Sequence, residues 1–146
     1  MYLHTIDSLT EHAFAPLLRA SLDEGYTFVQ SLYDDYQAGR NRFDQPGAVL
    51  LAAVLDGNWI AIGGVHPDTY LNQSHIGRIR HVYVLSAYRR TGVGRQLVTA
   101  LIDHAGRQFT LLTLRTLTAH GDAFYVSLGF TRDNRFSQAT HWLEIG

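Results

Sequence analysis

The sequence predicts a mixed α/β fold, in which one sheet carries helices on both faces. The chain has 146 residues, of which 46% are apolar and 17% are charged, and this suits one soluble domain over residues 1–146. Strand-like and helix-like segments follow one another in the order β-α-α-β-β-β-α-β-α-β-β. Helices both before and after a run of strands predict a mixed sheet that is covered on both faces.

The first residues are expected to form a strand followed by a helix. The strand covers Tyr2–Asp7, and the S-x-x-E capping box of Ser8 and Glu11 predicts that a helix begins there. Pro16 lies inside that helix, so we expect a kink or a restart, and Gly25 is expected to end it.

A second helix is predicted directly after the first. Thr27 and Gln30 repeat the capping pattern, and Gly39 lies where a C-terminal cap belongs. Apolar residues recur between them at helical spacing, namely Phe28, Val29, Leu32, Tyr33 and Tyr36.

The middle of the chain is expected to supply three strands. Two apolar runs, Val49–Leu55 and Trp59–His66, flank the turn Asp56-Gly57-Asn58, and this pattern is typical of a β-hairpin. A loop over Pro67–Ser74 follows. Ile76–Val84 is then predicted as a third strand in the centre of the sheet.

The second half is expected to continue with a loop over Ala87–Gly94 and a helix that ends near Ala105. The apolar stripe of this helix is Val93, Leu97, Val98, Leu101, Ile102 and Ala105. A strand, a short helix closed by Gly129, and two closing strands should follow, over Leu111–Thr116, Gly121–Leu128, Phe130–Asp133 and Thr140–Ile145.

Composition excludes several kinds of chemistry. The chain has no cysteine, which removes disulfides, thiol nucleophiles and cysteine-ligated metals, and all 12 basic residues are arginine, which removes every lysine-dependent site. No G-x-S-x-G or H-E-x-x-H pattern is present, and no metal is expected. No stretch resembles a signal peptide or a membrane span, so we expect a cytoplasmic protein.

Charge is divided unevenly along the chain. Residues 1–70 carry nine acids and three arginines, whereas residues 71–146 carry four acids and nine arginines. The arginines that cluster most closely are Arg78, Arg80, Arg89, Arg90 and Arg95. A solvated face and a polyanion site are both open interpretations of this cluster. A pI near 6.7 argues against a dedicated nucleic-acid binder and favours a small phosphorylated ligand.

The segment between the third central strand and the long helix is the strongest functional signal. Gly92 and Gly94 let backbone N–H groups approach a ligand, and the N-terminus of the helix adds unpaired donors. Arginines flank the same point, so the loop predicts a pyrophosphate site. A Rossmann fingerprint would need a third glycine where Leu97 stands, and a P-loop would need a lysine.

The run Arg89-Arg90-Thr91-Gly92-Val93-Gly94 resembles the R-x-x-G-x-G acetyl-CoA motif of the GNAT family, the GCN5-related N-acetyltransferases. Val82-Tyr83-Val84 is similar to the family's fourth strand, and the helix after the loop has the expected length. The run Phe124 to Phe130 is similar to the family's F-Y-x-x-x-G-F. The chain is therefore identified as a member of the GNAT family.

The resemblance implies the acyl-CoA N-acyltransferase fold, with a twisted, mostly antiparallel sheet of about seven strands. It also implies an N-acetyltransferase that moves an acetyl group from acetyl-CoA to a primary amine of a small molecule or peptide, by direct attack in a ternary complex. Homodimers are common among such relatives, and the closing strands offer an interface. The implied cofactor-binding residues are Val82, Tyr83, Val84, Arg89, Arg90, Thr91, Gly92, Val93, Gly94, Arg95, Thr118, His120 and Phe124.

Catalytic roles follow from the same resemblance. Tyr125 matches the family's general acid, which protonates the leaving thiolate; packing or orienting the sulfur is its alternative role. A backbone N–H near Val82 or Val84 is expected to stabilise the oxyanion. Many relatives carry a glutamate on the fourth strand as general base, but this sequence has none there. His81 is one candidate base; Glu24, Asp34 and Asp35 could contact the amine instead, and a mechanism without a base is also open. Strict alternation would place Arg78, Arg80, Val82 and Val84 on one face, and Ile79, His81 and Tyr83 on the other.

Two other regions are expected to complete the site. Thr118 stands where many relatives have a pantetheine-binding asparagine, and His120 follows at the start of the helix, where capping or exposure is the alternative role. Glu24, Tyr26 and Phe28 are expected to bind the acceptor, with packing in the core as the alternative role of the two aromatic residues. The acidic first half of the chain favours a cationic acceptor such as an amine.

Two alternatives to an enzyme stay open at this stage. The missing glutamate and the substitution at Thr118 are compatible with a non-catalytic acyl-CoA-binding sensor module. The arginine cluster is compatible with a nucleic-acid-binding domain, although no nucleic acid is expected as a partner.

Overall fold

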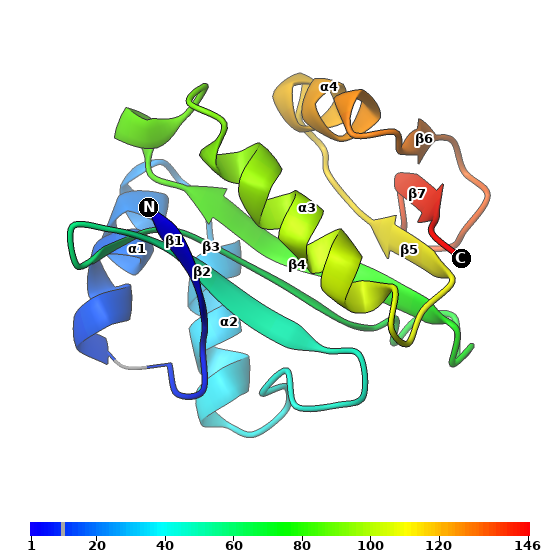
Figure 1. Cartoon of the computed structure of the whole chain (residues 1–146), viewed down its shortest axis with the longest axis horizontal. Helices are drawn as coiled ribbons and strands as arrows, with labels where there is room; N and C mark the ends of the chain where they lie inside the picture. The colour runs from blue at the N-terminus through cyan, green and yellow to red at the C-terminus, as the bar shows by residue number, and fades with distance from the viewer. Residues whose placement is uncertain (10) are drawn as a thin grey trace.

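The computed structural model describes residues 1–9 and 11–146, and over these residues it contains seven strands and four α-helices in the predicted order (Figure 1). The strands are β1 (Tyr2–Thr5), β2 (Val49–Leu55), β3 (Asn58–Pro67), β4 (Ile76–Val84), β5 (Leu111–Leu114), β6 (Thr131–Arg132) and β7 (His141–Glu144). The helices are α1 (Glu11–Asp23), α2 (Phe28–Gln37), α3 (Val93–Ala105) and α4 (Ala119–Ser127). A short 3-10 turn at Ser86–Tyr88 was not predicted.

The strands form one sheet in the order β1-β2-β3-β4-β5-β7-β6. Neighbouring strands are antiparallel, except that β4 and β5 run parallel. The predicted hairpin of β2 and β3 is confirmed, with Asp56 and Gly57 both at positive φ in its turn. The prediction of a mixed, mostly antiparallel sheet of about seven strands is therefore correct.

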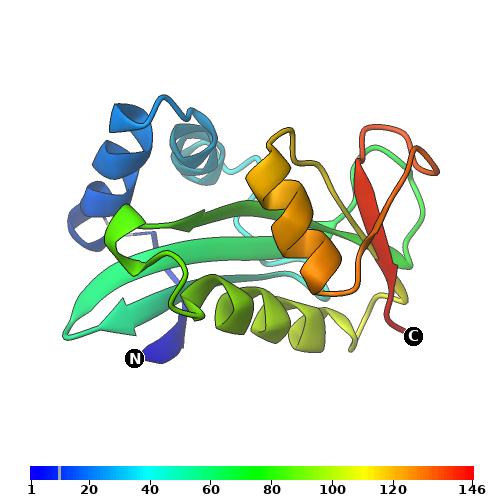
Figure 2. The ribbon, with the colours of Figure 1, turned by 90° about the horizontal axis from the view of Figure 1, so that it is seen from above.

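Helices cover both faces of the sheet, as Figure 2 shows from above. The helices α1 and α2 pack on one face, where Leu17 and Leu32 join Ile62 of β3 in a buried cluster. On the other face, Leu97 and Leu101 of α3 pack on the central strands. Burial of both faces explains why β2 and β3 are apolar along nearly their whole length.

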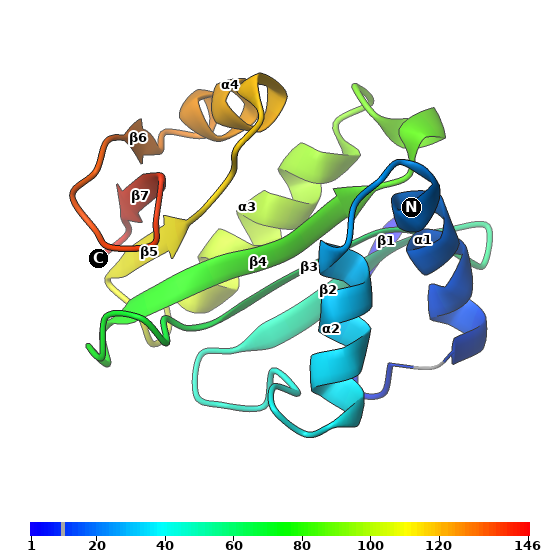
Figure 3. The ribbon, with the colours of Figure 1, turned by 180° about the vertical axis from the view of Figure 1, so that it is seen from behind.

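The pairing of β4 with β5 is short. Only three residue pairs connect the two strands in the described register, from Ile76 opposite Leu111 to Arg78 opposite Thr113. Beyond this point β4 continues to Val84 while the chain after β5 turns toward α4, and Figure 3 shows the two diverging. The divergence opens the sheet in its middle, and this is where the site lies.

A bulge in β4 overturns the expected alternation of its side chains. Arg80 pairs with Gly64 and Tyr83 pairs with Ile62, so His81 and Val82 together face one residue of β3, and His81 has a φ of 62°. Ile79 and Val82 therefore belong to the α3 side, and Tyr83 to the α1–α2 side. Alternation would have placed Ile79 with Tyr83, and the extra residue is the reason that it does not.

The first two helices lie close to their predicted positions, but the interactions expected at their ends differ. Thr27 is the N-cap of α2, but its side chain makes no capping hydrogen bond. Helix α1 does not restart at Pro16, because this exposed proline costs one hydrogen bond on the solvent side only. The capping box expected from Ser8 and Glu11 cannot be followed, since Thr10 and the Glu11 side chain lie outside the described residues.

Two boundaries in the second half differ from the prediction by two residues, and the other end of α4 and both ends of β6 and β7 differ by one. Strand β5 ends at Leu114 rather than at Thr116, because the chain leaves β4 before that point and loses its partner on that side. Helix α4 begins at Ala119, two residues before the predicted Gly121, because Thr118 caps it by accepting a hydrogen bond from the N–H of Gly121 at 3.0 Å.

Gly77 is expected to be essential where β4 meets β5. A Cβ at this position would lie 2.5 Å from the Phe109 ring and 2.9 Å from Leu112. We expect Gly77→Ala to lower the free energy of unfolding by about 1–3 kcal/mol, measured by urea denaturation. Gly106→Ala is the matched control, since its Cβ would meet nothing closer than 3.6 Å; a loss of equal size in both variants would contradict the steric explanation.

Candidate active site

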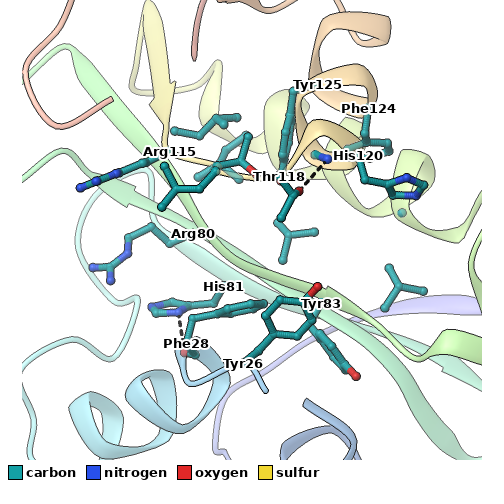
Figure 4. A pocket seen from close by; sticks show the side chains of 18 of the residues that line it. Tyr26, Phe28, Arg80, His81, Tyr83, Arg115, Thr118, His120, Phe124 and Tyr125 are labelled. Atoms are coloured by element: carbon teal, nitrogen blue, oxygen red, sulfur yellow. Dashed lines mark hydrogen bonds between the residues drawn. The ribbon is translucent and has the colours of Figure 1, made fainter. Parts of the chain in front are cut away.

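A cavity of about 1000 Å³ lies where β4 and β5 diverge. In Figure 4, Thr118, Tyr125 and Phe124 form one wall, and His81, Phe28 and Tyr26 form the opposite wall. The first wall comes from α4 and the segment before it, and the second from β4 and the α1–α2 connection. The cavity thus brings together residues from both halves of the chain.

One end of the cavity is formed by the loop of residues 89–94, here called the Arg–Gly loop. Gly92 is the N-cap of α3 with a φ of 88°, and a Cβ there would meet no atom within 4 Å. Arg90 and Arg95 line the same end. The open glycines, the helix N-terminus and these guanidinium groups together suit an anion of the size of a pyrophosphate.

Two residues predicted to bind the cofactor do not line this cavity. The Thr91 hydroxyl donates a hydrogen bond to the Tyr88 carbonyl, and Val93 is buried in the core on the α3 side. Only their backbone N–H groups remain as donors that a ligand could use. The side chains of Thr91 and Val93 do not contribute to the lining of this cavity.

Arg89 of the Arg–Gly loop is bound by Glu24, which lies in the connection between α1 and α2. Its guanidinium donates two hydrogen bonds to the Glu24 carboxylate, at 2.6 and 2.7 Å, and its Nε donates to the Val84 carbonyl at 2.9 Å. The Tyr83 hydroxyl donates to the same carboxylate. The Arg89 hydrogen bonds hold the pKa of Glu24 below its usual range. Glu24, predicted to bind substrate, therefore joins the α1–α2 connection to the Arg–Gly loop.

His81 is a buried, neutral side chain. Its Nδ1 donates a hydrogen bond to the Phe28 carbonyl at 3.0 Å, and burial lowers its pKa to about 3, with nearby Arg80 contributing. A donating Nδ1 leaves the lone pair on Nε2. At neutral pH a group with so low a pKa accepts a proton poorly, so the geometry gives little support to the predicted role of general base.

Tyr125 lies on α4 and is packed edge to face against Phe124 and Phe130. The residue is 8% exposed and borders the cavity, and burial raises the pKa of its hydroxyl above the usual value of 10. A raised pKa keeps the phenol protonated at neutral pH, which suits a proton donor. The structure thus brings Tyr125 and β4 to opposite walls of one cavity (Figure 4).

The remaining predicted residues also line the cavity. His120 is exposed at the start of α4, and Thr118 uses its oxygen to cap that helix. Tyr26 and Phe28 pack against Tyr83 and line the cavity. His120 and Thr118 could therefore contact a ligand from the α4 wall, and Tyr26 and Phe28 from the opposite wall.

Sequence reasoning missed a second cationic end of the cavity, formed by Arg78, Arg80 and Arg115, here called the distal arginines. Figure 4 shows Arg80 and Arg115 together, from β4 and from the residue after β5. The sequence grouped Arg78 and Arg80 with the loop arginines, but β4 separates the two groups. Arg115 could have been predicted as a site residue, because it directly follows the carboxyl end of β5, a strand parallel to β4.

The charge of the cavity also differs from the expectation. Six arginines line it, and no carboxylate is found among the described lining residues. The acids of the first half that lie nearby, Glu24 and Asp68, are bound to other groups of the protein. The acidic composition of residues 1–70 therefore does not produce an acidic acceptor pocket.

Over residues 1–9 and 11–146, no three His, Asp or Glu side chains gather as metal ligands would. The described helices are all too short or too polar to cross a bilayer.

A family model supports the interpretation of this geometry. The model described as the acetyltransferase (GNAT) family matches residues 10–130, which is most of the chain. The chain belongs to the GNAT family. The predicted acyl-CoA N-acyltransferase fold is thereby also confirmed.

Solved GNAT structures share this architecture. A proposed acetyltransferase of Exiguobacterium sp. 255-15 is 28% identical, with a TM-score of 0.87 over 98% of this chain and 92% of its own. An N-acetyltransferase of Escherichia coli in complex with CoA is 18% identical, with a TM-score of 0.75 over 99% and 81%. An aminoglycoside 6'-N-acetyltransferase with coenzyme A is 16% identical, with a TM-score of 0.70 over 100% and 98%. No curated protein matches the chain.

The neutral state of His81 predicts a pH-dependent stability. Its pKa of about 3 lies below the 6.5 expected in the unfolded chain, so the unfolded state binds the extra proton as pH falls below 6.5. The free energy of unfolding should therefore fall between pH 7 and pH 5, by about 1–2 kcal/mol more in the wild type than in His81→Asn.

Urea denaturation at both pH values measures this difference. Asparagine suits the variant because it tolerates positive φ. The exposed His12→Asn is the control and should follow the wild type. Equal pH dependence in His81→Asn and the wild type would show that His81 is not buried as a neutral group.

Proposed function

We propose that this GNAT protein is an N-acetyltransferase that uses acetyl-CoA to acetylate a primary amine of a small molecule or peptide. The observation that carries the proposal is the single cavity that extends from the Arg–Gly loop to the divergence of β4 and β5. The CoA complexes of two structural relatives support the same donor.

The residues at the cavity fit this donor. The pyrophosphate would lie at the N-terminus of α3, where Gly92 leaves room and Arg90 and Arg95 supply positive charge. The extended arm would lie along β4, whose edge has no strand beside it after Arg78. Phe124 and Thr118 line the opposite wall. Arg89 is bound by Glu24, so we assign it to joining the two loops rather than to the phosphates.

When bound, acetyl-CoA supplies the acetyl group as a thioester, which an unprotonated amine attacks directly. The bulge takes Val82 out of the regular register with β3, and its N–H is the proposed donor to the oxyanion. Tyr125, which its raised pKa keeps protonated, is the proposed donor to the leaving thiolate.

No residue is assigned as a strong general base. His81 is neutral and weakly basic, and no carboxylate lines the described cavity. The six arginines also disfavour a protonated amine close to the thioester. Both observations favour an acceptor whose amine has a low pKa, near that of an α-amino group at about 8 rather than that of a lysine side chain.

Donor binding is the first test. Acetyl-CoA at 100 times its dissociation constant should stabilise the protein by about 2.7 kcal/mol and raise the melting temperature by several degrees, whereas NADP and ATP should not match it. Gly92→Asp should abolish the shift, because it adds bulk and negative charge at the helix N-terminus. Gly92→Asn is the matched control, with similar size and no charge; equal loss in both would assign the effect to backbone strain.

Turnover separates an enzyme from an acyl-CoA sensor. We expect Tyr125→Phe to lower kcat by about 100-fold or more with acetyl-CoA affinity unchanged, because only the proton donor is lost. The exposed Tyr2→Phe is the control. A wild type that binds acetyl-CoA yet acetylates none of a broad amine panel would favour the sensor, and an active Tyr125→Phe would reduce Tyr125 to a packing role.

A further inference from the structure

The distal arginines form a cationic site that the donor does not explain. In an extended strand, residues advance by about 3.3 Å each, so Arg78 lies roughly 15–20 Å from Val84 along β4. The Arg–Gly loop lies beyond Val84. A ligand whose pyrophosphate is at that loop therefore has its phosphates far from the distal arginines, and the thioester would lie between the two groups.

Arg78 is unusual in being buried with unused donors. Its side chain is 6% exposed, borders the cavity, and has no hydrogen-bond partner for Nε or for one terminal nitrogen among the described residues. Burial lowers its pKa; Asp68 opposes this effect, and Arg80 and Arg115 add smaller lowering contributions. A buried guanidinium with donors that make no hydrogen bond is costly, so an anion bound at this end of the cavity would stabilise it.

The one nearby acid does not complete it. Asp68 lies 3.8 Å from the Arg78 guanidinium, beyond hydrogen-bond distance. Its oxygens instead accept hydrogen bonds from the Thr113 hydroxyl at 2.5 Å and from the backbone N–H groups of Tyr70 and Leu71 at 2.8 and 3.2 Å. One carboxylate against three arginines leaves this end of the cavity with a net positive charge.

The surroundings shape the site for a small planar anion. The Tyr70 ring lies 4.7 Å from the Arg78 guanidinium carbon and covers it from one side. Arg80 and Arg115 reach the same end from the two diverging strands (Figure 4). Guanidinium groups bind carboxylates through paired, parallel hydrogen bonds, which gives both strength and orientation.

We propose that the acceptor is an amino carboxylate, whose carboxylate group binds the distal arginines while its amine faces the thioester. The proposal rests on the proposed function and names its substrate class. A carboxylate at this end of the cavity can belong to the acceptor or to the acyl group of the donor. The distal arginines lie at the other end of the cavity from the Arg–Gly loop, where the phosphates of the donor would bind, and we therefore assign the carboxylate to the acceptor.

The test compares matched acceptors and matched variants. Acetylation from acetyl-CoA is measured for the α-amino acids other than proline and for their α-amides, which lose the carboxylate. Since the amide also has an amine of lower pKa, rates are compared per unprotonated amine. The best amino acid should exceed its amide in kcat/KM by about 10- to 100-fold, the range for hydrogen bonds to charged groups. Equal use of acid and amide by the wild type would overturn the proposal.

Arg80→Gln and Arg115→Gln are preferred to changes at Arg78, since both residues are more exposed and their loss leaves no buried cavity. Each should reduce kcat/KM for the acid by about 10-fold or more and leave the amide within about twofold. The exposed Arg107→Gln should change neither. An equal loss for acid and amide in both variants would overturn the proposed contact.

Two further measurements separate the possible failures. Binding of the N-acetyl acid and the N-acetyl amide to the CoA-loaded protein, by calorimetry, needs no turnover, and at least tenfold tighter binding of the acid is expected. Succinyl-CoA is compared with acetyl-CoA as donor; a preference for succinyl-CoA that Arg80→Gln removes would assign the arginines to the acyl group and overturn the acceptor assignment. Failure of acetyl-CoA to bind contradicts the proposed function instead.

Discussion

The three parallel residue pairs between β4 and β5 hold the two parts of the sheet together, and the length of this pairing decides where the site can form. On one side lie β1–β4 with α1, α2 and α3, and on the other lie β5–β7 with α4. Gly77 permits the close approach that the pairing needs, because the Phe109 ring occupies the space of a side chain. After Arg78 the strands separate, and the walls of the cavity come from both parts.

Electrostatics follow from this arrangement. With no lysine in the chain, every fixed positive charge at the cavity is a guanidinium group, which is planar and suited to paired hydrogen bonds. Glu24 neutralises the charge of Arg89 by forming an ion pair with it, and the Asp68 carboxylate accepts hydrogen bonds from Thr113 and from backbone N–H groups. The positive charge that remains is therefore concentrated at two places, the Arg–Gly loop and the distal arginines, with the low-polarity surface of Phe28, Val82 and Phe124 between them.

Local patterns predicted much of this molecule. The Asp-Gly turn of β2 and β3 and the left-handed Gly92 are fixed by short stretches of sequence, so they were predictable. The bulge at His81 was not, because a histidine at positive φ is imposed by its hydrogen bond to Phe28, 53 residues away, and by the packing of β3. The ion pair of Glu24 with Arg89 spans 65 residues. Likewise, Arg78 and Arg80 are close in sequence to Arg89 and Arg90, but the length of β4 places the two pairs at different ends of the cavity.

The divergence of β4 and β5 also leaves β4 with an unpaired edge inside the sheet after Arg78. Unpaired strand edges attract other strands and promote aggregation, and at the periphery proteins protect them with short strands, charges or covering elements. Here the edge borders a cavity whose opposite wall is α4 and the segment before it. The fold can thus keep backbone hydrogen-bonding capacity open for a ligand without presenting it to other proteins.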